Sequence, residues 1–306
     1  MKVLIYGFGR MGLTHYAILN SLLPDASFTF VDPNKVLNLI SKKNIKGKFV
    51  KSDKNLKGPF DITLITTPPF IHKDLLNNSL SRGDKRVFVE KPFGGHSNFD
   101  FNAEVKNVFI GYVLRFNPVV SWVKRSINPD DITEVKSQYL SNTIENKPKG
   151  WRNGAYSGVL NEMGSHILDL NNYLFNIQDY KILSKEKQSH ISDVDDEVKF
   201  SIDSKDRVFN FYFNWVDKSI RKPIFSVEVV LKNGDVIKFD QQKVQIEKDG
   251  KTQNISVVQL EESIPYYLRG VDFTKQMQDL LEGQHTLCNI EEALVTNNLM
   301  KEILQK

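Results

Sequence analysis

The chain opens with a strand-like apolar run, "KVLIY", that leads directly into the glycine turn "GFGRMG". The next segment, "RMGLTHYAILNSLL", has helical apolar spacing, so this stretch predicts a strand, a tight turn and a helix. Gly7 allows the tight turn, Gly9 lets the backbone approach a pyrophosphate closely, and Gly12 lets the predicted helix pack against the first strand. This order of elements restricts the fold strongly, because it is typical of dinucleotide-binding α/β domains.

An acid in the right place strengthens this interpretation. Asp32 ends a second apolar strand, "SFTFVD", and follows Gly12 by 20 positions, where a carboxylate can accept from both hydroxyls of an adenosine ribose. A carboxylate there repels a 2′-phosphate, so NAD is favoured over NADP. The predicted cofactor contacts in this region are Gly7, Phe8, Gly9, Arg10, Met11, Gly12 and Asp32.

The pattern of elements changes near the first third of the chain. Strands are expected over 61–69, 86–92 and 107–116, alternating with helical segments, which predicts a doubly wound parallel sheet in residues 1–116. Residues 117–306 instead show period-two alternation with turns at Asn233-Gly234 and Asp249-Gly250, and then two closing amphipathic helices. We therefore expect an α/β protein whose second domain, 117–306, is an α+β domain with a large, open and mainly antiparallel sheet.

In "VFNFYFNWV" the side chains of Phe209, Phe211, Phe213 and Trp215 share one face of the predicted sheet. This aromatic face is expected in the core. An open sheet face rich in apolar side chains would need a cover, so we predict a homodimer or homotetramer through the C-terminal sheet.

Composition excludes several classes of protein. Cys288 is the only cysteine, which fits a reducing compartment, and "MKVLIYGFG" leaves no room for a signal peptide, so the cytoplasm is expected. No apolar run reaches the roughly 18 residues that would predict a membrane span. The lysine-rich run over 41–58 holds one aromatic residue, Phe49, and is interpreted as a solvated face rather than a nucleic-acid site.

The stretch "SGVLNEMGSHILDL" places Glu162, His166 and Asp169 at helical spacing i, i+4 and i+7. Two acids and an imidazole on one stripe could bind a metal, transfer protons, or form a solvated helix face. The local pattern does not choose between these.

Several ordered segments together resemble the glucose-fructose oxidoreductase, inositol dehydrogenase and rhizopine-catabolism (Gfo/Idh/MocA) family. They are "GFGRMG" with His15, "TTPPFIH", "VEKP", "GYVLRFNP", "WR", "GVLNEMGSHILDL" and "YYLRGVDFTKQMQDLLEG", and they span almost the whole chain. The resemblance implies a Rossmann domain first and an α/β domain with an open sheet second.

The resemblance also implies roles for particular residues. Lys91 matches the lysine at the substrate hydroxyl, His166 matches the general acid/base, Glu162 stands where aspartate is usual, and Asp169 matches the acid near the histidine. These four are the predicted catalytic residues. The remaining cofactor contacts are predicted to be Thr66, Thr67, Pro68, His72, Glu90 and Lys91.

Predicted substrate contacts are Arg115, Trp151, Arg152, Glu162 and His166, although both arginines could equally pin the two domains together, and packing could explain Trp151. No second histidine-rich segment accompanies the stripe, so no metal is expected. This sequence departs from the family pattern in two places. Glu162 is longer than the usual aspartate, and the segment from Pro92 to Val108 is shorter than the helix that commonly follows "EKP".

The resemblance implies an NAD(P)-dependent oxidoreductase that transfers hydride between nicotinamide and a secondary hydroxyl of a sugar, sugar nucleotide or cyclitol. Basic residues make a phosphorylated or nucleotide-linked carbohydrate a reasonable partner. The alternatives are an NAD-dependent glycoside hydrolase of the same family and a non-catalytic nucleotide-sensing regulator.

Overall fold

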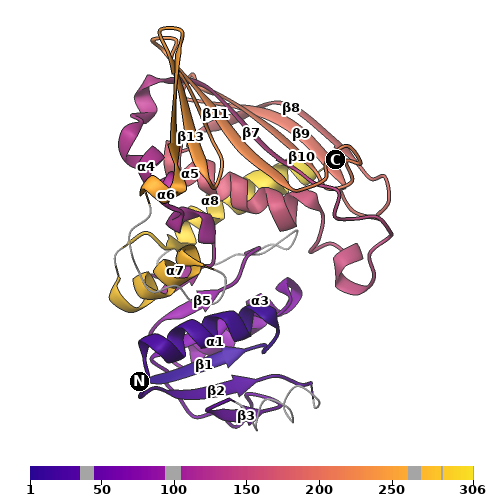
Figure 1. Ribbon diagram of the computed structural model, residues 1–306. Helices are drawn as coiled ribbons and strands as arrows, with labels where there is room; N and C mark the ends of the chain where they lie inside the picture. The colour runs from indigo at the N-terminus through magenta and orange to yellow at the C-terminus, as the bar shows by residue number, and fades with distance from the viewer. Residues whose placement is uncertain (35–44, 94–104, 261–269, 284, 306) are drawn as a thin grey trace. The chain divides into compact units, whose positions relative to one another are not determined.

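The computed structural model describes residues 1–34, 45–93, 105–260, 270–283 and 285–305, which form two compact units (Figure 1). Unit 1 comprises Met1–Val113 and Ile264–Ala293, and unit 2 comprises Leu114–Ser263 and Leu294–Lys306. The division predicted from the sequence, 1–116 and 117–306, stays a prediction. Most of the predicted short segment after Pro92, and part of the lysine-rich run, lie outside the described residues.

Unit 1 is built on a seven-stranded sheet in the order β15-β6-β5-β4-β1-β2-β3. All neighbours pair in parallel except β15, which runs antiparallel to β6. The order 3-2-1-4-5-6 of the parallel strands is that of a doubly wound dinucleotide-binding sheet, which confirms the predicted fold class. The strands are β1 (Lys2–Tyr6), β2 (Ser27–Val31), β3 (Lys48–Val50), β4 (Ile62–Ile65), β5 (Val87–Val89), β6 (Val108–Ile110) and β15 (Cys288–Asn289).

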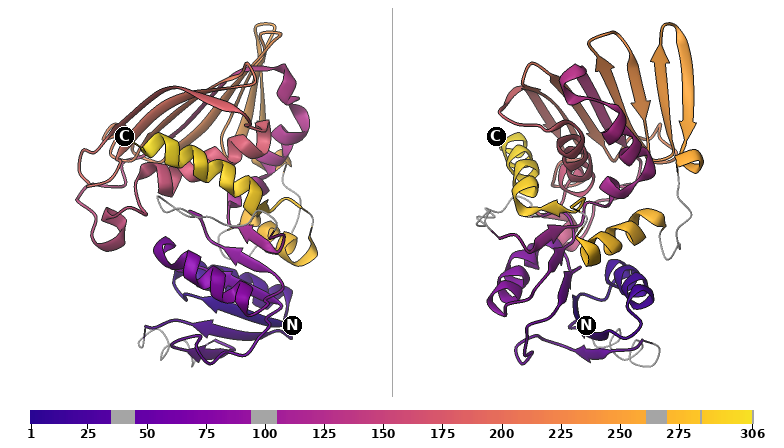
Figure 2. Two further views of the ribbon diagram at one scale, coloured as in Figure 1. Left: turned by 180° about the vertical axis from the view of Figure 1, so that it is seen from behind. Right: turned by 90° about the vertical axis from the view of Figure 1, so that its left-hand side faces the viewer.

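Helices cover both faces of this sheet. Helix α1 (Arg10–Leu22) and helix α7 (Val271–Glu282) pack together on one face, and α3 (His72–Ser81) lies on the other (Figure 2). The β-strands read as continuous apolar runs because both of their faces are buried: all four residues of β4 are buried, as are all three of β5. Within the described ranges, no helix has the length and apolar character needed to cross a bilayer.

Unit 2 contains an eight-stranded sheet in the order β14-β13-β12-β11-β7-β10-β9-β8, in which only the β10 and β7 pair is parallel. Positive φ angles at Gly234 (89°), Asp249 (48°) and Gly250 (71°) form the two hairpin turns expected from the sequence. The strands are β7 (Ile132–Leu140), β8 (Tyr180–Gln188), β9 (Glu197–Ser204), β10 (Val208–Asn214), β11 (Ile224–Leu231), β12 (Val236–Phe239), β13 (Lys243–Lys248) and β14 (Lys251–Ser256).

One face of this sheet is covered by helices and forms the core of unit 2 (Figure 1). Phe209, Phe211, Phe213 and Trp215 are buried there, as the alternation predicts. They pack with apolar residues of α4 (Pro118–Ser126), α5 (Ser165–Phe175) and α8 (Ile290–Leu304). Short helical turns η2 (Val113–Phe116), η3 (Pro129–Asp131), η4 (Gly150–Asn153), η5 (Leu160–Gly164) and α6 (Val257–Leu260) complete the unit.

The opposite face of the sheet is mainly polar, so the expectation of an open face rich in apolar side chains is wrong. A shallow groove of about 520 Å³ on this face is lined largely by lysine, glutamate, serine, asparagine and glutamine. Lys136 faces Glu228 on the next strand at 3.2 Å, and Lys238 pairs with Glu247 at 3.1 Å. Opposite charges placed across neighbouring strands stabilise a solvated sheet face, which removes the need for an apolar cover.

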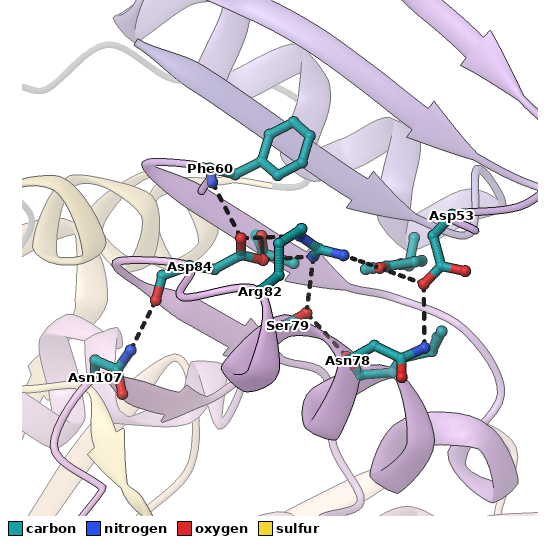
Figure 3. A network of polar contacts seen from close by, with 10 residues as sticks. Asp53, Phe60, Asn78, Ser79, Arg82, Asp84 and Asn107 are labelled. Carbon is teal, nitrogen blue, oxygen red and sulfur yellow. Dashed lines mark hydrogen bonds and ion pairs between the residues drawn. The ribbon is translucent and has the colours of Figure 1, made fainter. Parts of the chain in front are cut away.

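A polar network below the glycine turn fixes the end of β1 to the neighbouring elements of unit 1 (Figure 3). The Tyr6 hydroxyl donates to Asp53 at 2.8 Å and accepts from the Arg82 guanidinium at 3.0 Å. Arg82 in turn forms a 2.5 Å ion pair with buried Asp84, which also accepts from the Thr63 hydroxyl of β4. Burial raises the pKa of Tyr6, so the hydroxyl stays protonated and keeps donating.

Candidate active site

The glycine turn of unit 1 has the geometry that each glycine was predicted to provide. Gly7 has a φ of 80°, and a Cβ at Gly12 would lie 2.1 Å from the Gly7 carbonyl oxygen, so α1 can approach β1 only with glycine there. A Cβ at Gly9 would meet nothing within 4 Å, which leaves open space over the turn. Gly9 is the N-cap of α1 and, as a glycine, supplies no side-chain cap to the helix. The amides of the first turn can therefore bind a pyrophosphate.

Asp32 lies directly after β2 with its carboxylate held in a fixed orientation. One oxygen accepts from the Phe8 backbone amide at 2.8 Å, and the other accepts from the Asn34 amide at 2.8 Å. A carboxylate has several acceptor positions, so the same two oxygens can also accept from ribose hydroxyls. The Phe8 side chain is buried against Phe30, with ring centroids 4.6 Å apart, so only its backbone could contact a cofactor.

The ends of β4 and β5 bring two further predicted segments to the same end of the sheet. The Thr66 hydroxyl donates to carbonyls of the glycine turn, at 2.9 Å from Tyr6 O and 2.7 Å from Gly7 O. The Thr67 hydroxyl is buried and has no hydrogen-bond partner in the described part of the chain, as expected of a group that a ligand would satisfy. The turn, Asp32 and Thr67 thus fit a dinucleotide.

Two buried histidines hold these loops in place. His72 Nε2 lies 2.8 Å from the Thr67 carbonyl oxygen, and burial lowers the pKa of His72, which keeps its ring neutral. His15 Nε2 lies 2.7 Å from Glu90 Oε1, so Glu90 is bound to α1. The sequence pattern assigns Glu90 to the cofactor and does not predict its pairing with His15. The only sequence signal for His15 is its place beside "GFGRMG" in the family segments.

Lys91 follows Glu90 and is half-buried, and the Lys91-Pro92 peptide bond is cis. Pro68 is exposed and is the N-cap of the turn Pro69–Ile71. Arg10 is exposed and Met11 half-buried at the start of α1. All predicted cofactor residues thus lie in unit 1, in the glycine turn, directly after β2, β4 and β5, or, for His72, at the start of α3.

The acid and imidazole stripe belongs to unit 2, and its helix differs from the expected regular one. Leu160–Gly164 is π-helical and continues as α5 from Ser165. Such π turns are frequent at functional sites because they change which side chains share a face. Glu162 and His166 are half-buried, and Glu162 Oε1 accepts from the Ser157 hydroxyl at 2.5 Å.

Asp169, the third member of the stripe, is fully buried and forms an ion pair with Arg115. The guanidinium donates to its two carboxylate oxygens at 2.9 and 2.6 Å, and both side chains are 1% exposed. Arg115 also lies over the Tyr173 ring at 4.7 Å. Both residues of this pair belong to unit 2. The two roles expected of Arg115, binding an anionic substrate or pinning the two domains together, stay predictions.

Trp151 and Arg152 lie on the short turn Gly150–Asn153, with the Arg152 guanidinium 5.5 Å from the centre of the Trp151 ring. Trp151 is half-buried and Arg152 is exposed. This loop is tied to Asp193, which accepts from Lys147 and Asn153 at 2.6 Å each. Among the described residues, no group of three or more His, Cys, Asp or Glu side chains is placed to hold a metal ion.

Comparison with known proteins agrees with this geometry. Residues 1–98 match the Gfo/Idh/MocA family model, described as an oxidoreductase family with an NAD-binding Rossmann fold. The sequence matches no curated protein.

Solved structures share the fold along nearly the whole chain. Levoglucosan dehydrogenase in complex with NADH has a TM-score of 0.78 and 16% identity, and the match covers 99% of this chain and 96% of that one. An oxidoreductase domain protein from Kribbella flavida has a TM-score of 0.80 and 17% identity, covering 98% and 95%. UDP-N-acetylglucosamine 3-dehydrogenase from Acidithiobacillus ferrooxidans has a TM-score of 0.73 and 13% identity, covering 99% and 96%.

At these identities the likeness to solved structures is a likeness of fold, whereas the sequence match covers residues 1–98, which include all predicted cofactor contacts. Residues 1–98, less than half of the chain, are therefore similar to the NAD-binding Rossmann domain of the Gfo/Idh/MocA oxidoreductase family.

Proposed function

We propose that this protein is an NAD-dependent dehydrogenase that transfers hydride between the nicotinamide and a secondary hydroxyl of a sugar, sugar nucleotide or cyclitol. The observation that carries the proposal is the glycine turn at the start of α1 with Asp32 beside it, in residues that match an NAD-binding oxidoreductase family. Structures of similar fold include a levoglucosan dehydrogenase with NADH and a UDP-N-acetylglucosamine dehydrogenase, which supports a carbohydrate substrate.

The proposed chemistry assigns two groups of the chain to the substrate hydroxyl. Bound NAD would supply the hydride acceptor. The ammonium of Lys91 would stabilise the negative charge that develops on the oxygen, and His166 would accept its proton, since imidazole suits proton transfer near neutral pH. Glu162, which accepts from Ser157, would orient the imidazole or the substrate.

The exposed Arg152 and the half-buried Trp151 support a substrate with both an anionic group and a sugar ring. A guanidinium binds phosphate or carboxylate in a two-point geometry, and an aromatic face packs on a sugar. We therefore propose a phosphorylated or nucleotide-linked carbohydrate, in a cytoplasmic enzyme.

Two alternative functions are a glycoside hydrolase that uses bound NAD and a regulator that binds the cofactor without turnover. Nicotinamide absorbance followed during the reaction distinguishes them from a dehydrogenase, because only a dehydrogenase changes it.

Thermal shift with NADH and NADPH tests the cofactor half of the proposal. NADH is expected to raise the melting temperature of the wild type, since a ligand at about 100 times its Kd stabilises the native state by about 2.7 kcal/mol. The Asp32→Asn variant keeps an acceptor for the Phe8 amide but removes the charge. We expect its preference for NADH over NADPH to fall about 10-fold or more.

The matched control is Asp25→Asn, an exposed aspartate of the same unit, which should leave both shifts unchanged. Equal stabilisation of the wild type by the two cofactors would contradict the assigned role of Asp32. If neither cofactor acts, NAD released on denaturation would show that the site was already filled, and its absence would overturn the proposed function.

We also propose that the protein forms a homodimer or homotetramer through the polar face of the unit 2 sheet. The cross-strand pairs of Lys136 with Glu228 and Lys238 with Glu247 give this face both signs of charge, so a second copy can be complementary to it. Light scattering at micromolar concentration should show the oligomer at about 0.1 M salt and partial dissociation at about 1 M, where charges are screened within about 3 Å. A monomer at low salt would refute this assembly.

A further inference from the structure

The loop between β8 and β9 in unit 2 carries three aspartates that each hold a different partner. We call residues 189–196 the aspartate loop. Asp196 ties the loop to itself and to the core, and Asp193 holds the turn that carries Trp151 and Arg152. The donors to Asp196 are the amides of His190, Ile191 and Ser192, the Ser192 hydroxyl and the Trp215 indole, at 2.6 to 2.9 Å. The loop is therefore a rigid support.

The third member, Asp195, holds the entry to the helix that carries Glu162 and His166. Its carbonyl oxygen accepts from the Val159 amide at 2.8 Å, and its carboxyl accepts from the Leu160 amide at 2.9 Å. Leu160 is the first residue of the π turn, and its own N-cap, Val159, provides no side-chain hydrogen bond. The cap is thus supplied by a residue 35 positions further along the chain.

The backbone before this helix is shaped around the same carboxyl. Gly158 has a φ of 113°, and a Cβ there would lie 2.1 Å from Asp195 Oδ1. Any other residue at 158 would displace the carboxyl or strain the turn. This turn also fixes the backbone of Glu162, because the Glu162 amide donates to the Gly158 carbonyl oxygen at 2.9 Å.

We propose that Asp195 is a positioning residue: its bonds to Val159 and Leu160 set where the helix begins, and so fix Glu162 and His166 for reaction. The proposal rests on the proposed function for the roles of those two side chains. A positioned group misplaced by about 1 Å costs about 100-fold in rate, so a residue that touches no substrate can still control kcat.

The charge state of Asp195 gives this role a pH dependence. Burial raises its pKa to about 7. The hydrogen bond from the Leu160 amide and the charge of Lys187 on β8 lower the pKa, and the charge of adjacent Asp196 raises it. When the turn opens, the bonds of Asp195 to Val159 and Leu160 break and its carboxyl is exposed to water, so its pKa returns to the ordinary value of about 4. The closed turn therefore binds the proton more tightly, and its stability is greatest below pH 4 and decreases as the pH rises to about 7.

The test compares hydrogen exchange of the backbone amides in residues 157–166 for the wild type, Asp195→Asn, Asp195→Ala and the control Asp249→Asn. Asp249 occupies an exposed hairpin turn at positive φ, where asparagine is tolerated. We expect Asp195→Ala to exchange about 10-fold faster in this segment, because the cap is lost. Asp195→Asn, which cannot ionise, should lose the pH dependence that the wild type shows after correction for intrinsic exchange.

Kinetics and NADH binding complete the design. With the sugar identified for the wild type, Asp195→Ala should lower kcat about 10- to 100-fold and leave the Kd of NADH unchanged. Wild-type exchange rates in Asp195→Ala, pH-dependent exchange retained in Asp195→Asn, or faster exchange without loss of kcat would each overturn the proposal. The exchange arm uses no substrate, so its failure is distinguishable from failure of the proposed dehydrogenase activity. If Asp195→Ala does not fold, Asp195→Asn still decides it.

Discussion

Replacing Lys91 by methionine is expected to lower kcat/KM for the sugar about 1000-fold while the Kd of NADH changes less than about threefold. Methionine keeps the length of the side chain and removes only the ammonium that would stabilise the developing alkoxide. The backbone should not move, because Glu90 is bound to His15 at 2.7 Å and Pro92 is buried. Steady-state kinetics and fluorescence titration with NADH measure the two quantities.

The matched control is Lys85→Met, in the same unit, whose side chain is 65% exposed in an ion pair with Asp61. This change removes an equal charge from a solvated site and should leave kcat/KM within about twofold, since exposed ion pairs contribute at most about 1 kcal/mol. Retention of more than about a tenth of the activity by the Lys91 variant would show that the ammonium is not used in the reaction.

Breaking the Arg115 and Asp169 ion pair is expected to lower the free energy of unfolding by about 3–5 kcal/mol. Both side chains are 1% exposed, so Arg115→Met or Asp169→Leu alone would leave a buried charge without its partner. The double variant should be less destabilised than either single one, because neither charge of this pair then remains buried without the other. Urea denaturation followed by circular dichroism gives the three values and their coupling.

A further variant, Asp169→Asn, decides what Asp169 does. If it acts by holding Arg115, the loss of kcat in Asp169→Asn should follow the loss of folded protein, and activity per folded molecule should be kept. A variant as stable as the wild type but inactive would instead favour the predicted role near His166. Asp61→Asn, in the exposed pair with Lys85, is the stability control and should change unfolding by less than about 1 kcal/mol.

The fold was predictable where it depends on local pattern. Strands β1, β2 and β4 are buried apolar runs, and the glycines and Asp32 are placed by the short connections between them, so spacing alone gives their neighbourhood. Strand β3, three residues inside the lysine-rich run, was not expected, because its pairing with β2 is set by tertiary contact rather than by propensity.

The residues proposed for the site come from sequence motifs, whereas their geometry could not be read from the sequence. The π turn at Leu160–Gly164 leaves no mark in a helical spacing count, and the partners of Asp169 and Leu160 lie 54 and 35 positions away. Sequence periodicity carries no information on such pairs. The polar face of the large sheet, by contrast, could have been predicted from alternating polar residues such as Lys136 and Gln138.

The course of the chain through its two units determines which residues are needed to express unit 1 on its own. The chain leaves unit 1 after Val113, returns to it in time to form α7 and β15, and leaves again within α8. A fragment that stops at residue 116 would therefore lack the helix that packs on α1 and the edge strand that pairs with β6. A soluble, separately expressed cofactor-binding module should instead join residues 1–113 to the segment that contains α7 and β15 through a short designed linker.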